Sequence, residues 1–234
     1  MGLNSSSLSI EEYMRKEKSG NDIILTPTEG YDSIFIWLHG LGDSASSFID
    51  FFSNENRPIP KRMKVIMLNA PICPVTINGG MQMPSWFDIK NLNKFHICEE
   101  QALNNALKII NTINTEVKNV KDDYSKIFIG GFSQGASLSL LVGFTSKYNL
   151  GGIVCCSGFL FPTIVLKDDK KLLPIFAFHG TNDLTIRESL ANQSYKRLVD
   201  NKFNFVYKQT KQGHEIRQEQ FKDIKSFIEN NIKI

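Results

Sequence analysis

Short apolar runs alternate with longer stretches of helical spacing over most of the chain. The apolar runs predict strands, each bounded by Gly, Pro, Asn or Asp: Ile34 to His39, Val65 to Asn69, Lys126 to Gly130, Gly152 to Cys156, Ile175 to His179 and Phe203 to Lys208. Two apolar stripes predict amphipathic helices, one through Leu103, Ala106, Leu107, Ile110, Ile113 and Val117 and one through Phe221, Ile224, Phe227 and Ile228. This alternation favours the α/β class, with a mostly parallel central sheet and helices on both faces.

The domain organisation is simple. The chain has no internal repeat and no linker rich in Pro, Gly or Ser, so we expect one domain over residues 21–234. Residues 1–20 are expected to form an N-terminal appendage, in which Ser9 and Glu12 fit a capping box for a short helix over Ile10 to Lys18. Irregular segments are predicted at Asn54 to Arg62 and Pro71 to His96, and long loops of this kind often lie over a functional site.

The composition of 234 residues, 41% hydrophobic and 22% charged, excludes disorder across the whole chain. A net charge of +3, with lysines scattered rather than gathered in a stripe, argues against nucleic acid as a partner. No apolar stretch approaches the ~20 residues of a membrane-spanning helix, and the N-terminus lacks the apolar core of a secretory signal. We therefore expect a cytoplasmic protein. Its cysteines lack CxxC spacing and are expected to be reduced and mostly buried: Cys73, Cys98, Cys155 and Cys156.

A serine motif gives the strongest functional signal. The strand-like run 127–131 leads through Phe132, Ser133 and Gln134 to Gly135 and then into a helical stretch, which places Ser133 in a GxSxG sequence. At such a strand-to-helix turn the serine is held in a strained conformation with its Oγ exposed above the sheet. GxSxG alone would arise by chance in this chain with a probability of roughly 0.1, so its position between strand and helix is what makes Ser133 a candidate nucleophile.

A serine nucleophile needs a base and an acid, which follow it on this kind of fold in the order Ser, Asp or Glu, His. His39 and His96 precede Ser133 in the chain. His179 would leave only carboxylates in a Lys-rich surface loop as the acid. His214, between the last predicted strand and the last helix, is therefore the predicted base.

Asp183 is the predicted acid, because it directly follows an apolar strand and would lie at the ligand-binding edge of the sheet. Glu188 and Glu215 are its rivals, and helix capping is the structural alternative for Asp183. His179 is expected to pack beneath the site.

Negative charge that develops on a substrate oxygen requires N–H donors fixed in advance. The backbone N–H of Gln134, at the start of the helix after the serine, is one predicted donor. The segment His39-Gly40-Leu41-Gly42 begins with HG and has small residues that let a ligand approach the backbone, so Leu41 is the second predicted donor.

Six segments together resemble the acyl-protein thioesterase and lysophospholipase family of small carboxylesterase-like α/β-hydrolases. The resemblance covers residues 30 to about 232 and is carried by FIWLHGLGDSASSF (35–48), NAPICPVTINGGMQMPSWFDI (69–89), IFIGGFSQGASLSLLVGF (127–144), CCSGFLFP (155–162), HGTND (179–183) and GHEI (213–216). The APxxPVT and MPSWFD parts are more specific than GxSxG, because generic esterases lack them. The resemblance implies an α/β-hydrolase fold without a large cap, nucleophile Ser133, acid Asp183, base His214 and oxyanion donors Leu41 and Gln134.

The implied reaction is hydrolysis of a thioester or ester through an acyl-enzyme on Ser133, without metal or organic cofactor. Fatty-acyl thioesters of S-acylated (palmitoylated) proteins are the expected substrates; lysophospholipids or small esters are the alternative, and a lipid-binding protein that has lost catalysis is a third reading. The acyl chain is expected to lie in a shallow groove lined by Trp86, Met81, Met83 and Phe159. We expect a monomer or a weak homodimer.

The first six residues, MGLNSS, fit the MGxxxS pattern for N-myristoylation at Gly2. One myristoyl chain gives only marginal binding to a bilayer, so the pattern predicts a transient membrane contact.

Overall fold

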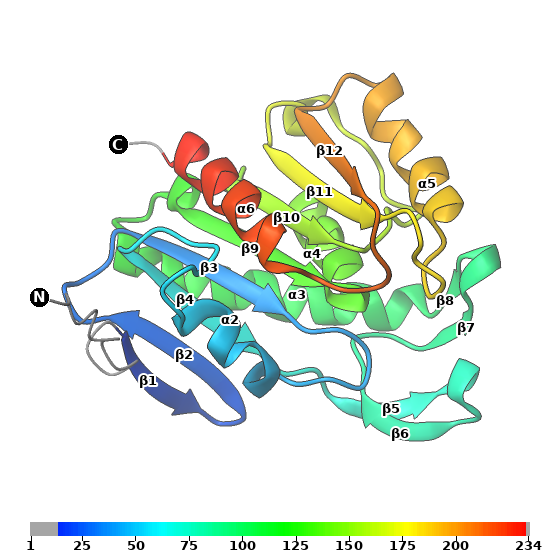
Figure 1. The fold of residues 1–234 in the computed structure, drawn as a ribbon, viewed down its shortest axis with the longest axis horizontal. Coiled ribbons are helices and arrows are strands. Elements are labelled where there is room, and N and C mark those ends of the chain that lie inside the picture. The colour runs from blue at the N-terminus through cyan, green and yellow to red at the C-terminus, as the bar shows by residue number, and fades with distance from the viewer. Residues whose placement is uncertain (1–13, 233–234) are drawn as a thin grey trace, which may run out of the picture.

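An eight-stranded sheet forms the centre of the protein, of which the computed structural model describes residues 14–232 (Figure 1). Its strands are β1 (Met14–Ser19), β2 (Asp22–Pro27), β3 (Ser33–Leu38), β4 (Met63–Leu68), β9 (Ile127–Phe132), β10 (Gly152–Cys156), β11 (Ile175–Gly180) and β12 (Phe205–Thr210). They lie in the order β1-β2-β4-β3-β9-β10-β11-β12, antiparallel at β1 and β2 and parallel from β4 to β12. The mostly parallel sheet and all six predicted strands are confirmed, with ends shifted by at most two residues.

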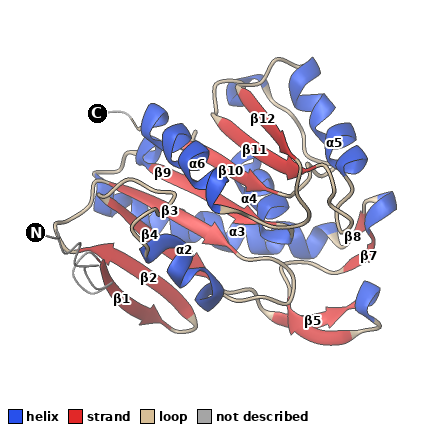
Figure 2. Cartoon of the chain, in the orientation of Figure 1, coloured by secondary structure: helices blue, strands red, loops and turns tan. Residues whose placement is uncertain are grey.

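Helices cover both faces of this sheet (Figure 2). They are α2 (Ile49–Ser53), α3 (Glu99–Glu116), α4 (Gln134–Thr145), α5 (Glu188–Asp200) and α6 (Gln218–Asn231). Successive side chains of a strand point to opposite faces, and β3 shows the result. Ile34, Ile36 and Leu38 join the core under α3, α4 and α5, whereas Phe35 and Trp37 join the core under α2 and α6. The predicted covering of both faces is therefore correct, and residues 14–232 form no large cap over the sheet.

The buried face of α3 differs from the predicted stripe. Ala106, Ile113 and Val117 of that stripe are buried as predicted, but Leu103 and Leu107 are 43% and 46% exposed. The helix turns Ala102 and Asn105 inward in their place. Asn105 explains this rotation, because its Nδ2 donates a hydrogen bond of 2.6 Å to the carbonyl of Trp86. The small alanines beside it leave room for the close approach.

The helix expected over Ile10 to Lys18 is wrong where the structure describes it, because Met14–Ser19 is strand β1. A two-residue turn joins β1 to β2, with Gly20 at φ +63°, a value that suits glycine in a tight hairpin. Only Met14 of β1 is buried, and the charged residues after it lie exposed along the edge of the sheet. Residues 14–19 thus belong to the central sheet rather than to an appendage. The MGxxxS pattern lies outside the described residues.

The segment Pro71 to His96, predicted to be irregular, contains two short hairpins. One pairs β5 (Ile72–Val75) with β6 (Met81–Pro84), and the other pairs β7 (Ile89–Asn91) with β8 (His96–Ile97). The carbonyl of Pro84 accepts a 2.8 Å hydrogen bond from the N–H of Gly42, which ties this segment to the loop after β3. Over the described residues, no helix has both the length and the apolar character needed to cross a membrane.

Candidate active site

Ser133 occupies a sharp turn between β9 and α4. Its φ of +55° and ψ of −114° are strained for a residue with a side chain, and its N–H donates to the carbonyl of Cys156 at 2.8 Å. Glycines on both sides make the turn sterically feasible. A Cβ at Gly131 would lie 2.5 Å from the carbonyl oxygen of Leu38, and one at Gly135 would lie 2.2 Å from that same oxygen. The two glycines of the GxSxG sequence therefore allow β3, β9 and α4 to pack closely together at Ser133.

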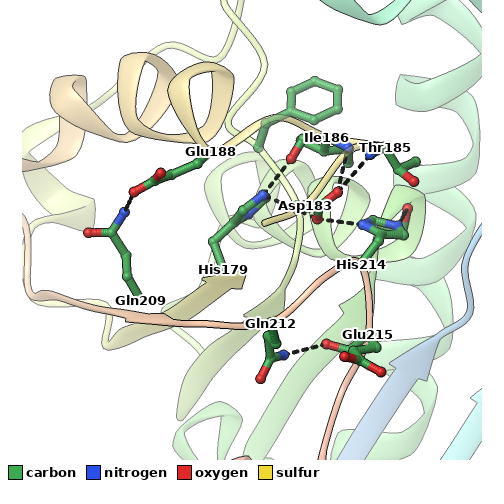
Figure 3. Close-up of polar contacts among 12 residues, drawn as sticks. His179, Asp183, Thr185, Ile186, Glu188, Gln209, Gln212, His214 and Glu215 are labelled. Carbon is green, nitrogen blue, oxygen red and sulfur yellow. Dashed lines mark hydrogen bonds and ion pairs between the residues drawn. The ribbon is translucent and has the colours of Figure 1, made fainter. Parts of the chain in front are cut away.

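His214 lies beside this serine, as the order of residues predicted. The loop that follows β12 carries it, and its Nε2 lies 2.8 Å from the Oγ of Ser133. The Phe132 ring packs against the imidazole, with ring centroids 4.8 Å apart. Gln212 braces the loop by donating from Nε2 to the carbonyl of Glu215 at 2.7 Å (Figure 3). His214 is thus positioned to take a proton from Ser133.

Asp183 completes the arrangement from the loop after β11. Its Oδ2 lies 2.6 Å from Nδ1 of His214, and its side chain is fully buried. The other oxygen, Oδ1, accepts the backbone N–H groups of Thr185 and Ile186, both at 2.9 Å. A neutral His214 then carries its proton on Nδ1 and presents the Nε2 lone pair to Ser133.

Burial alone would raise the pKa of the Asp183 carboxyl, but the hydrogen bonds from His179 and His214 outweigh it, aided by the charge of His214 and a backbone N–H. The net effect is a pKa well below the usual range. Asp183 therefore remains an anion next to His214 and stabilises the imidazolium that forms when His214 takes a proton.

Both of the other histidines that lie next to the sheet edge are fully buried. His39 donates from Nδ1 to the carbonyl of Gly40 at 2.7 Å and accepts at Nε2 from the N–H of Ala70 at 3.0 Å. Burial lowers the pKa of His39, which keeps it neutral in this role. His179 lies beneath Asp183, with Nε2 3.3 Å from Oδ2. Sequence reasoning placed His179 beneath the site but missed this contact with the acid.

The two predicted oxyanion donors border the same cavity. Leu41 and Gln134 both line a pocket of about 230 Å³ in front of Ser133. Among the described residues, no acceptor is found for the backbone N–H of Leu41 or of Gln134. Gln134 is the first residue of α4, where backbone N–H groups lack intrahelical partners. Both groups are therefore available to an oxygen bound in the pocket.

The pocket is mainly apolar, and it contains one of the four side chains predicted to line a groove. Its lining comprises Gly40, Leu41, Asp43, Phe87, Ile89, Leu92, Phe132, Ser133, Gln134, Phe159, Thr185, Ile186 and His214. Phe159 is the predicted residue that it includes. Met81 is 64% exposed on β6 and, like the half-buried Met83, lies outside this lining. Trp86 is 3% exposed and faces inward, because its indole N–H donates to the carbonyl of His39 at 2.9 Å.

Sequence reasoning missed the polar contacts that hold Trp86 and its neighbours. Oε1 of Gln134 accepts the backbone N–H of Trp86 at 2.9 Å. Nε2 of the same side chain donates to Ser85 Oγ and to the Phe87 carbonyl. Gln134 thus serves twice, with its backbone facing the pocket and its side chain fixing the segment that supplies Phe87 to the pocket wall. The only sequence signal for these contacts was the polar side chain of Gln134 directly after the GxSxG serine.

A larger groove of about 530 Å³ lies between α3, α4 and residues 161–167. Its lining has neither serine nor histidine, so the smaller pocket, which contains Ser133 and His214, is the candidate active site.

All four cysteines are free, but only Cys155 and Cys156 are buried, and burial raises the pKa of the Cys155 thiol to about 12. The described residues contain no cluster of His, Cys, Asp or Glu suited to a metal ion.

A parallel sheet with a serine at a strained strand-to-helix turn, backed by histidine and aspartate, defines a serine hydrolase of the α/β-hydrolase class. Comparison with known proteins agrees: the sequence model of the phospholipase/carboxylesterase family matches residues 20–232. The chain belongs to this family.

Two relatives in fungi and one solved structure illustrate the likeness. Acyl-protein thioesterase 1 of Yarrowia lipolytica is 34% identical over 210 residues, which cover 85% of this chain and 91% of the relative. Acyl-protein thioesterase 1 of Schizosaccharomyces pombe is 36% identical over 188 residues, covering 77% and 82%. The crystal structure of acyl-protein thioesterase 2 of Zea mays has a TM-score of 0.80 at 24% identity and covers 92% of this chain and 100% of that one, which supports the fold.

Proposed function

We propose that this serine hydrolase removes fatty-acyl groups from S-acylated proteins by cleaving their thioesters. The observation that carries the proposal is the hydrogen-bonded series from Ser133 Oγ through His214 to Asp183, with distances of 2.8 Å and 2.6 Å. The names of the relatives, acyl-protein thioesterase 1, supply the substrate class. The apolar pocket beside Ser133 suits an acyl chain.

The reaction follows from this geometry in two halves. His214 takes the proton of Ser133 as Oγ attacks the acyl carbon, and the negative charge on the substrate oxygen is bound by the N–H groups of Leu41 and Gln134. The tetrahedral intermediate collapses, the carbon–sulfur bond breaks, and His214 passes its proton to the leaving thiolate. A water molecule, deprotonated by His214, then attacks the acyl-enzyme; the bond between the acyl carbon and Oγ breaks, His214 returns the proton to Oγ, and the fatty acid leaves. These residues supply every proton transfer and charge contact that the two halves require.

The pocket walls indicate where the acyl chain binds. Phe159 contacts Phe95 and Phe161, with ring centroids 5.4 Å apart in both pairs, and so belongs to a continuous aromatic surface. Phe87 joins that surface through Phe161 at 5.2 Å. We assign the first part of the acyl chain to this wall, with Phe159 and Phe87 in place of the predicted Trp86 and the two methionines.

Substitution of the nucleophile tests the proposal. Ser133→Ala should lower kcat on an S-palmitoylated peptide by a factor on the order of 10⁶, as expected when the nucleophile of a serine hydrolase is lost. The variant should unfold at the urea concentration of the wild type within error, because only a hydroxyl is removed. Hydrolysis at the wild-type rate by Ser133→Ala would refute the role of Ser133.

Substrate class is decided by a side-by-side comparison. We expect kcat/KM of the wild type to be higher for an S-palmitoylated peptide than for a lysophospholipid or a short-chain ester. The reverse order would favour lysophospholipase or carboxylesterase activity. Reaction of Ser133 with a fluorophosphonate probe distinguishes all of these from a lipid-binding protein without catalysis.

We also propose that residues 21–234 act as one domain, with strand β1 added to its sheet edge.

A further proposal is that the N-terminus is myristoylated at Gly2. Exposed Arg15, Lys16 and Lys18 on β1 support a membrane contact, because stable anchoring by one myristoyl chain needs a second signal such as basic residues. A mass spectrum of the native protein with an unmodified N-terminus would refute the myristoyl group.

A further inference from the structure

His179 lies on the side of Asp183 opposite His214 (Figure 3). It is the fifth residue of β11 and is fully buried. Its Nε2 lies 2.6 Å from the carbonyl oxygen of Ile186 and 3.3 Å from Oδ2 of Asp183. His179 does not line the pocket in front of Ser133.

The other ring nitrogen of His179 reveals which tautomer is present. Within the described residues, Nδ1 is buried and has no hydrogen-bond partner. Both neighbours of Nε2, the Ile186 carbonyl and the Asp183 carboxylate, are acceptors. The proton of the neutral ring therefore resides on Nε2, which donates to both.

Packing alone does not explain a histidine at this position. An unpaired nitrogen in the interior costs free energy, and a phenylalanine ring of similar outline would fill the space without that cost. The feature that a phenylalanine cannot supply is the Nε2–H that His179 gives to Ile186 and Asp183.

We propose that His179 is a positioning residue, which holds the carboxylate of Asp183 in the orientation that serves His214. The inference rests on the proposed function, because it assigns His179 a role only through the acid of that mechanism. Its donor faces the same Oδ2 that accepts from His214, while Oδ1 is held by backbone N–H groups.

A closed ring of hydrogen bonds gives this role its geometry. His179 donates to the carbonyl of Ile186, Ile186 donates its N–H to Oδ1 of Asp183, and Oδ2 of Asp183 faces His179 again. Loss of the Nε2–H opens the ring at two places. The carboxylate then gains freedom to rotate about its Cβ–Cγ bond, and His214 loses a fixed acceptor for Nδ1–H.

His179→Phe tests the role of the donor. We expect kcat on an S-palmitoylated peptide to fall about tenfold, the effect of losing a modest hydrogen bond to a charged group, with KM unchanged. The rate at which a fluorophosphonate labels Ser133 should fall by the same factor. His179→Gln, whose Nε2–H₂ reaches nearly as far, should recover most of the lost kcat.

Lys170→Met is the matched control for loss of a buried donor. Nζ of Lys170 donates to the carbonyl of Tyr148 at 2.9 Å, in the segment that leads into the opposite end of β11. This variant should lower the free energy of unfolding without changing kcat. A purely structural role for His179 would make His179→Phe behave in the same way, and that result would overturn the inference.

The wild-type protein provides a test that does not depend on a variant folding. Nitrogen NMR of ¹⁵N-histidine-labelled protein should show that the ring proton of His179 is on Nε2. A proton on Nδ1, or equal kcat losses in His179→Gln and His179→Phe, would also overturn the inference. Failure of the proposed function is seen separately, as turnover that survives in Ser133→Ala.

Discussion

The serine and the acid are held in place by different forces. Ser133 sits where backbone meets backbone: Gly131 and Gly135 have no room for a Cβ because the carbonyl of Leu38 lies against both. Asp183 sits in a loop whose neighbour Leu184 is 89% exposed, and hydrogen bonds to its two carboxylate oxygens fix it there. Close packing therefore determines the first site, and polar contacts determine the second.

The difference predicts how each site fails. At the serine turn, added volume should lower the free energy of unfolding, whereas removal of the hydroxyl should leave the fold intact. At the acid loop, an isosteric change of charge should abolish most catalysis while the fold persists. Substitutions that separate activity from stability are therefore the way to break or sharpen the comparison.

After Ser133→Ala, Asp183→Asn should have the largest effect on kcat. Its neutral amide keeps the size of the side chain but no longer stabilises an imidazolium on His214, and in a serine protease the equivalent change lowers kcat about 10⁴-fold. We expect a loss of that order on an S-palmitoylated peptide, with a far-ultraviolet circular dichroism spectrum like that of the wild type. Activity within tenfold of the wild type would show that another carboxylate orients His214.

The three proposed catalytic residues, which the structure brings together, could be selected from the sequence because their order along the chain is constrained. Ser133 was placed by its strand and helix, and His214 and Asp183 followed from their positions after it. The parallel strands were predictable for a related reason, since strands covered on both faces are continuously apolar. The charged strand β1 was not, because an edge strand exposed on most of its length has no apolar pattern to distinguish it from a surface helix.

Contacts between distant polar groups were the part that sequence could not provide. Trp86 was expected in the acyl groove because it is large and apolar, yet its N–H needs a buried acceptor and finds the carbonyl of His39. The approach of His179 to Asp183 likewise depends on a turn that brings Ile186 back over β11. Side-chain type alone predicts a need for partners but not their identity.

Gly135→Ala should have an intermediate effect, and it acts on stability. Its Cβ would lie 2.2 Å from the Leu38 carbonyl oxygen and 2.5 Å from that of His39. Both are backbone atoms, so the clash cannot be relieved by rotation of a side chain. We expect the free energy of unfolding to fall by about 3 kcal/mol or more, measured by urea unfolding. The matched control is Gly213→Ala, where nothing lies within 4 Å of the new Cβ and the change should stay below about 0.5 kcal/mol. Equal stability of the two variants would remove packing as the force that fixes Ser133.

Glu215→Gln should have the smallest effect, although Glu215 adjoins the base in sequence and was a rival for the acid. Its carboxylate turns away from His214 and pairs with Arg217, with both side chains nearly half exposed. Exposed ion pairs contribute about 0–1 kcal/mol, so the free energy of unfolding should hardly change. We expect kcat to remain within about twofold of the wild type, because Nδ1 of His214 is already hydrogen-bonded to Asp183. A tenfold loss of kcat would mean that a charge beside the imidazole, and not only the buried carboxylate bonded to it, stabilises the proton on His214.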